Sequence, residues 1–220
     1  FYVVPYHAVH WLENQGAGGW KHHQLLQLPG VHRVEAGDLD GDGDLDLVAC
    51  TLITNRAMGE MKTSRFVSLV WLEQVKKGEF IRHNLETGHC THATLELADF
   101  DGDGDLDVLT ASSAGNWEGN IIWYENDGSE NFTTHDITTS ANGAYSVYAA
   151  DVDGDGDMDV LSASFGDDKI AWYENDGSES FTAHTITTSA DYAHSVYAVD
   201  VDGDGDVDVL SASGWVDGYE

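Results

Sequence analysis

The stretch Asp151-Val-Asp-Gly-Asp-Gly-Asp-Met-Asp159 carries five aspartates at alternate positions. The same pattern returns at residues 38–46, 99–107 and 200–208, so the chain contains four copies. Carboxylates this close together repel one another unless a cation lies among them. Calcium accepts about six to eight oxygen ligands in irregular geometry, whereas magnesium requires a compact octahedron. The sequence therefore predicts one calcium ion in each of the four loops.

Each loop is expected to curl around its ion. The first, third and fifth residues would point inward, the seventh would offer its backbone carbonyl, and the ninth would complete the shell. Two glycines, Gly154 and Gly156 in the third copy, permit the positive φ values that this curl requires. The predicted metal ligands are Asp38, Asp40, Asp42, Asp44, Asp46, Asp99, Asp101, Asp103, Asp105, Asp107, Asp151, Asp153, Asp155, Asp157, Asp159, Asp200, Asp202, Asp204, Asp206 and Asp208.

These loops also look like the first half of an EF-hand, which needs a glutamate at position 12 and a helix on each side. Position 12 is instead Ala49, Thr110, Ser162 or Ser211. The flanking segments are short, apolar and rich in β-branched residues, which is typical of strands. Each loop is therefore predicted to connect two strands of a β-hairpin. The alternative is an acidic turn that is simply solvated.

The repeat period indicates the fold class. Offsets of 61, 52 and 49 residues separate the four loops. A unit of about 50 residues with four strands is typical of a blade of a β-propeller. In the third unit we expect strands at 146–151, 159–164, 169–175 and 181–186, with a tight turn at Asn175-Asp-Gly-Ser178 between the last two. The fold class is therefore all-β, a propeller of four-stranded antiparallel blades.

The chain is predicted to form one repeat domain with an incomplete unit at each end. The first residues match the last two strands of a blade, and the final residues match the first two. These two half blades could pair and close a ring of four, or the chain could be an arc of a larger ring. The predicted units are a half blade at 1–30, complete blades at 31–88, 89–140 and 141–189, and a half blade at 190–220 within the single domain 1–220.

The charge of the chain limits its partners. The formal net charge is −31, and the four loops hold half of the 40 acidic residues. This balance argues against nucleic acid and anionic membranes as partners. An insertion at about residues 51–68 carries Arg56, Lys62 and Arg65, and is either a tolerated surface loop or a partner-binding loop. No run of 18 apolar residues predicts a membrane span, and the start at Phe1 suggests a mature product or a fragment.

Several residues recur once per unit and are interpreted as structural. A tryptophan, a histidine and a glutamate hold equivalent positions on the last two strands, where a large ring can pack one blade on the next. The periodic residues are Trp11, Trp71, Trp123, Trp172, His23, His83, His135, His184, Glu13, Glu73, Glu125 and Glu174.

Other residues do not follow the repeat. The pairs His7/His10, His22/His23 and His89/His92 could hold zinc or copper, but their spacing fits no familiar site. Cys50 and Cys90 lie one repeat apart and could pair, or Cys50 could be a small core residue. Asn131-Phe-Thr133 is a glycosylation sequon, usable if the chain is secreted.

The aspartate loop, the hairpin Trp123-Tyr-Glu-Asn-Asp-Gly128 and the period of about 50 residues together resemble the FG-GAP/VCBS repeat family. That family includes the calcium-binding blades of the integrin α-chain propeller. The resemblance implies that the fourth aspartate of each loop, at the seventh position, binds through its carbonyl, and that the complete fold is usually seven-bladed. It also implies an extracellular or cell-surface adhesion, ligand-binding or structural module.

Three functions follow as hypotheses. The first is an extracellular calcium-binding module with a structural or adhesive role, which binds a protein or glycan or assembles with copies of itself. The second is a lectin-like domain with a ligand face opposite the calcium loops, built from Trp117, Tyr145, Tyr192, His194 and Trp215. The third is the propeller part of a polysaccharide lyase-type enzyme. The sequence shows no nucleophile arrangement, phosphate loop or zinc-hydrolase motif, so we expect no enzymatic activity.

Overall fold

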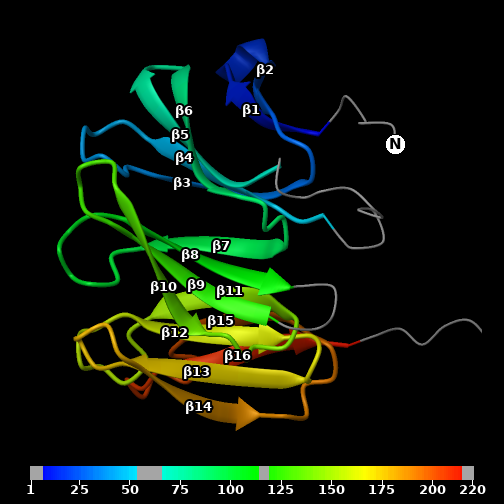
Figure 1. The fold of residues 1–220 in the computed structure, drawn as a ribbon, viewed down its shortest axis with the longest axis vertical. Helices are drawn as coiled ribbons and strands as arrows, with labels where there is room; N and C mark the ends of the chain where they lie inside the picture. Colours follow the sequence, from blue (N-terminus) through cyan, green and yellow to red (C-terminus); the bar gives the residue numbers. More distant parts are fainter. Residues whose placement is uncertain (1–6, 54–65, 114–118, 215–220) are drawn as a thin grey trace, which may run out of the picture.

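A computed structural model describes residues 7–53, 66–113 and 119–214 of the chain (Figure 1). The described residues form strands β1 to β16 and one short 3-10 helix, η1 (Gly16–Gly18). Among them, no helix has the length and apolar character needed to cross a membrane. The chain is therefore all-β in its described part, as the strand-like flanks of the aspartate loops predicted.

Three antiparallel sheets of four strands follow one another along the chain, and each has the form of a propeller blade. The first contains β3 (Val31–Gly37), β4 (Asp46–Thr51), β5 (Val67–Lys76) and β6 (Glu79–Thr87). The second contains β7 (His92–Ala98), β8 (Asp107–Ser113), β9 (Gly119–Asn126) and β10 (Phe132–Thr138). The third contains β11 (Ala144–Ala150), β12 (Asp159–Ser164), β13 (Lys169–Asn175) and β14 (Phe181–Thr187).

Two sheets of two strands stand at the ends. We call β1 (Ala8–Asn14) and β2 (Trp20–Gln27) the N-terminal half blade, and β15 (Ala193–Val199) and β16 (Asp208–Ser213) the C-terminal half blade. In Figure 1 the N-terminal half blade lies at the top, whereas β15 and β16 lie near the bottom, beside the strands of the third blade. Across the described residues the strands form an open arc with no closed ring, and the half blades do not share a sheet.

Apolar clusters hold each sheet against the next because alternate residues of a strand face opposite sides. Trp123 and Tyr173 belong to the cluster between the second and third blades, with Val147 on the innermost strand. Trp172 belongs to the next cluster, between the third blade and the C-terminal half blade. Trp172 and Tyr173 thus face opposite sides of β13. The first strands of successive blades contact one another, so they form the inner side of the arc.

The fold makes a prediction that uses two identical hexapeptides. Asp-Val-Leu-Ser-Ala-Ser forms both β12, which is buried throughout, and β16, which is largely exposed. Leu161→Ala should lower the free energy of unfolding by about 2–5 kcal/mol because it leaves a cavity between two blades. The matched change Leu210→Ala should cost no more than about 0.5 kcal/mol. Denaturant unfolding of both variants measures this, and equal losses would contradict the packing described here.

Candidate metal centres and the opposite edge

The four aspartate loops lie at one edge of the arc, on the left of Figure 1, because each joins the first strand of a blade to the second. Each aspartate is numbered here by its position in the nine-residue loop, so the five aspartates are the first, third, fifth, seventh and ninth. The ninth aspartate of each loop is also the first residue of that second strand. Asp46, Asp107 and Asp159 are buried at this position, whereas Asp208 in the C-terminal half blade is exposed. The loop and the blade therefore share a residue.

Hydrogen bonds from backbone N–H groups to the aspartates set the curl of each loop. In the third copy, Gly156 N–H donates to Asp151 Oδ2 at 3.1 Å, and Val152 N–H donates to Asp159 Oδ2 at 2.9 Å. The other three loops repeat both bonds. Gly154 and Gly156 have φ values of 78° and 103°, as the glycine positions predicted.

Carboxylate oxygens converge inside each loop. In three loops, oxygens of the first, third and ninth aspartates lie within 4.8 Å of one another, and in the first loop those of the first, third and fifth do. Asp38 Oδ1 is buried and has no hydrogen-bond partner. These oxygens suit a hard divalent cation. The groups are Asp38, Asp40 and Asp42; Asp99, Asp101 and Asp107; Asp151, Asp153 and Asp159; and Asp200, Asp202 and Asp208.

The remaining loop aspartates have other contacts. Asp155 Oδ1 accepts the Asp157 N–H at 2.9 Å, which supports the curl from within. The Asp157 carboxylate lies against Gly177 in the turn between β13 and β14, where an added Cβ would overlap it. Asp105 and Gly128 repeat this approach in the second blade. The turn glycine of the hairpin motif is thus explained by its close contact with the aspartate loop.

Four of the loop aspartates lie where burial disfavours their charged form and raises their pKa values. Burial raises the pKa of Asp107 to about 6, against hydrogen bonds from Asn126 and Phe100 N–H that lower it. Burial also raises the pKa values of Asp40, Asp101 and Asp159, and neighbouring carboxylates add to the effect. A bound divalent ion would supply the missing positive charge.

An asparagine at the end of the third strand ties the second and the third aspartate loop each to the preceding blade. Asn175 N–H donates to Asp159 Oδ1 at 2.8 Å, and its Nδ2 donates to the carbonyl of Phe100, in the loop of the second blade, at 3.3 Å. Asn126 makes the same bonds, to Asp107 and to the Leu39 carbonyl at 2.7 Å. The sequence pattern indicated only a turn here, so this role was missed, although the recurrence of the asparagine was its signal.

The recurrent tryptophan, histidine and glutamate contact one another in each of the three complete blades and in the N-terminal half blade. His135 stacks on Trp123 with ring centroids 4.5 Å apart, and its Nε2 lies 2.6 Å from Glu125 Oε2. The other three sets repeat this geometry. Trp71 and Trp123 are buried, while Trp11 and Trp172 are partly exposed. The structural interpretation of these residues is confirmed.

Three of the five residues predicted for a ligand face come together near the edge opposite the aspartate loops. The rings of Tyr145 and His194 lie 5.6 Å apart, and Phe165 lies 5.2 Å from His194 and 4.9 Å from Tyr192. We call these four residues the aromatic cluster. Sequence analysis missed Phe165. Trp117 and Trp215 lie outside the described residues, as do Arg56, Lys62 and Arg65 of the insertion.

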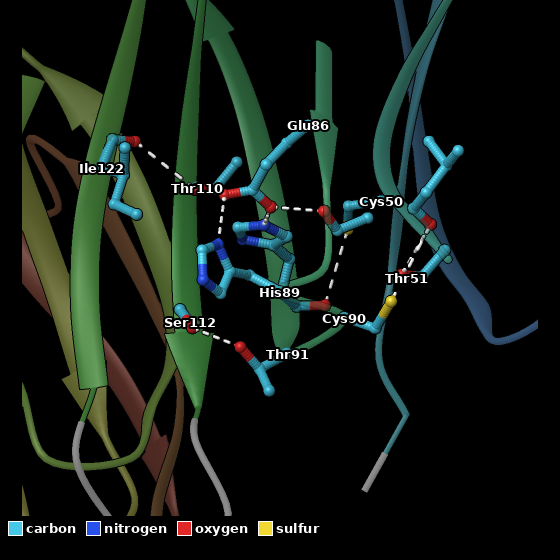
Figure 2. Close-up of polar contacts among 12 residues, drawn as sticks. Cys50, Thr51, Glu86, His89, Cys90, Thr91, Thr110, Ser112 and Ile122 are labelled. Atoms are coloured by element: carbon cyan, nitrogen blue, oxygen red, sulfur yellow. Dashed lines mark hydrogen bonds and ion pairs between the residues drawn. The ribbon is translucent and has the colours of Figure 1, made fainter. Parts of the chain in front are cut away.

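A second polar cluster lies between the first and second blades (Figure 2). Glu86 accepts hydrogen bonds from Ser68, from Tyr124 OH at 3.1 Å and from His92 Nε2 at 2.7 Å, and it also contacts His89. His92 is fully buried at a position where the other units have Val31, Ala144 or Ala193. Sequence analysis missed this cluster, and the departure of His92 from the repeat was its signal.

The remaining sequence predictions have simple outcomes. Cys50 and Cys90 are buried free thiols, so they do not pair. Asn131 is exposed, as a glycosylation site requires, and its Nδ2 donates to Asp127 Oδ2 at 2.9 Å. Among the described residues, the groups of three or more potential metal ligands include neither His10 and His22 nor His89 and His92. They do include Glu125, His135 and Glu179.

These observations define a repeat protein of blade-like antiparallel sheets with an acidic loop between the first two strands of each unit. The FG-GAP-like repeat model matches residues 1–49, 99–162 and 151–211, which together span most of the chain. The chain belongs to the FG-GAP-like repeat family, whose repeats are typical of extracellular proteins. No curated protein matches it in a sequence comparison.

The Glu86 cluster predicts a defined dependence of stability on pH. Burial raises the pKa of Glu86, but the hydrogen bonds and charge of His92 and the bonds from Ser68 and His89 outweigh burial and lower it to about 2, from 4.5. A lowered pKa in the folded state stabilises the fold above about pH 4.5, and this stabilisation is lost as the pH falls towards 2.

Glu86→Gln should therefore lower the free energy of unfolding by about 1–3 kcal/mol at neutral pH because it removes charge-assisted hydrogen bonds. The difference from the unchanged protein should shrink as the pH falls below 4.5, the ordinary pKa of this group. Urea unfolding of both proteins in the same buffers measures it. Glu79→Gln, at a side chain that is 63% exposed, is the control. A difference that stays constant with pH would contradict the assigned pKa.

Proposed function

We propose that the chain is an extracellular β-propeller module that binds about four calcium ions, one in each aspartate loop, and that acts as a structural or adhesive element. The convergent carboxylates carry this proposal, since oxygens of at least three aspartates in each loop lie within 4.8 Å of one another. The first, third, fifth and ninth aspartates would bind through carboxylate oxygens, and the seventh through its carbonyl. We propose no catalytic role for these loops.

Calcium in this position would act on the fold rather than on a substrate. The ion would neutralise carboxylates that connect the first two strands of a blade, and the ninth aspartate is hydrogen-bonded to the third strand. The same third-strand asparagine reaches the preceding blade. Calcium binding would thus stabilise the contact between blades as well as the loop.

Calcium removal tests this role. An ion present at 100 times its dissociation constant stabilises the folded state by about 2.7 kcal/mol per site. In a chain of this size, chelation should therefore lower the melting temperature by about 5 °C or more. Asp153→Asn should remove one site from a calorimetric titration with calcium, whereas Asp136→Asn, outside the loops, should remove none. A melting curve that is unchanged in excess chelator would contradict the structural role of calcium.

A second candidate function, glycan binding, is favoured by the aromatic cluster. Aromatic rings that are partly open to solvent can stack on the apolar faces of sugars, and Tyr192 is 40% exposed. Tyr145 and His194 come from the first strands of neighbouring blades, β11 and β15, so the cluster lies on the inner side of the arc. A ligand bound there would contact more than one blade.

Glycan binding is tested on an array of polysaccharide fragments. Tyr192→Ala should weaken binding to any glycan that the unchanged protein retains by about 1–3 kcal/mol, the range for loss of an aromatic stacking contact. Tyr197→Ala, at a tyrosine that is 49% exposed on β15 but outside the cluster, should leave binding unchanged. An array without hits, or equal losses in both variants, would count against this function.

A further inference from the structure

A cavity of about 360 Å³ lies where the first complete blade meets the second. Glu86 comes from the first of these blades, His89 from the segment between them and Ser112 from the second, and all three are labelled in Figure 2. Eight of the nine lining residues are polar, and none of the nine is a lysine or an arginine. Both blades are complete, and all nine residues lie in the described ranges.

The acidic residues of this cavity depart from the repeat. Glu86 lies at the position that Thr138 holds at the next interface, between the second and third blades. Asp136 lies at the position that Thr185 holds there. The hydrogen bonds described above keep the pKa of Glu86 at about 2, so its carboxylate is charged at neutral pH. Two carboxylates thus stand where the corresponding space has two neutral threonines.

The next interface also shows what occupies that corresponding space. Lys169 of the third blade holds the position of Asn120, as their pairing with the second strand shows. The Lys169 side chain is only 19% exposed, and its Nζ donates to the carbonyl of Ser140 at 3.4 Å. Ser140 lies in the segment between the second and third blades, just as His89 lies in the segment between the first and second. An ammonium group is therefore present at one interface, and the shorter Asn120 leaves its place open at the other.

The polar groups that line the cavity suit an ammonium group. Among the described residues, Asn120, Thr134 and Asp136 make no side-chain hydrogen bond, so their oxygens are available as acceptors. An ammonium group has three N–H donors and no acceptor, which matches three such oxygens. Ile122, the one apolar lining residue, pairs with Asp136 across β9 and β10 and offers a surface for an alkyl stem.

The histidine of this cluster is a further departure from the repeat. His92 is fully buried and its Nδ1 has no hydrogen-bond partner, while its Nε2 contacts Glu86 at 2.7 Å. A buried ionic pair is seldom more stabilising than apolar residues of similar volume. The next interface packs with Thr138 and Ala144 at these positions, so the fold does not require the pair. A role in ligand binding accounts for it.

We propose that this cavity binds a primary alkylammonium group, which is the chemistry that Lys169 supplies to the corresponding space at the next interface. The ammonium group donates to the Asp136 carboxylate, to Asn120 Oδ1 and to Thr134 Oγ1. Its alkyl stem packs on Ile122. A free amine and a lysine side chain of another protein share this chemistry. The proposal goes beyond the structural and glycan-binding functions and does not rest on either.

NMR titration of the full chain in excess calcium tests the site. Butylamine should bind with a dissociation constant in the millimolar range or below and shift the backbone amide signals of Asn120 and Asp136. The neutral molecule 1-butanol, which has the same length, should bind at least about tenfold more weakly because it brings no charge to the carboxylates. Amine-induced shifts that are confined to the aspartate loops would contradict the site.

A peptide with an acetylated N-terminus and one internal lysine, titrated in the same way, distinguishes the two sources of the group. Tighter binding of the peptide than of butylamine identifies a lysine of a partner protein as the ligand. Tighter binding of butylamine identifies a small amine. Binding of neither molecule would overturn the proposal.

Asn120→Lys gives the sharpest result because it builds into this cavity the side chain that the third blade already carries at Lys169. It should weaken butylamine binding at least about tenfold, while circular dichroism and the melting temperature match those of the unchanged protein. Asp136→Asn should also weaken binding about tenfold. Glu79→Gln, which removes a charge at a side chain that is 63% exposed, is the control and should bind normally. Unchanged affinity in Asn120→Lys and Asp136→Asn, or binding of 1-butanol as tight as that of butylamine, would overturn the proposal.

Discussion

The chain places five aspartates at the junction of two strands, and the structure depends on how their mutual repulsion is offset. The loop folds because backbone N–H groups converge on these carboxylates, and the ninth aspartate receives donors from both the loop and the third strand. The residue that provides the third-strand donor, Asn175, also reaches a carbonyl of the preceding blade through its side-chain amide. The hydrogen bonds of the loop therefore also hold the third strand of the blade and its contact with the preceding blade. Burial raises the pKa values of Asp107 and Asp159, the ninth residues of two loops, so the cation that we propose there would stabilise their charged form.

Much of this fold could be predicted from the sequence because its signals are local. The bounds predicted for the second and third strands of the third unit agree with β12 and β13, since the aspartate loop and the Asn175–Ser178 turn fix their ends. The predicted first strand began at Ser146, but β11 begins at Ala144. The register of β11 shifts between Ala144 and Ser146, and strand-like alternation cannot reveal such an irregularity.

Features that depend on contacts between units could not be predicted in the same way. Glu86 and His92 lie on different strands, and their contact involves Ser68 and Tyr124 from two blades. The predicted inward position of the fifth aspartate agrees with the cluster of the first loop, but the other loops group the ninth aspartate instead. The exposure of β16 follows from its place at the end of the arc, since its sequence is identical to that of the buried β12. Sequence repeats therefore predict the units, whereas the burial of each unit depends on its neighbours.

Crystals grown in calcium, with anomalous diffraction data measured at long wavelength, test most directly whether the aspartate loops bind calcium. Each of the four aspartate loops should contain one anomalous peak at about 2.3–2.6 Å from carboxylate oxygens of the first and third aspartates and from the carbonyl oxygen of the seventh. Well-ordered loops without anomalous peaks in saturating calcium would contradict the proposal that these loops bind calcium.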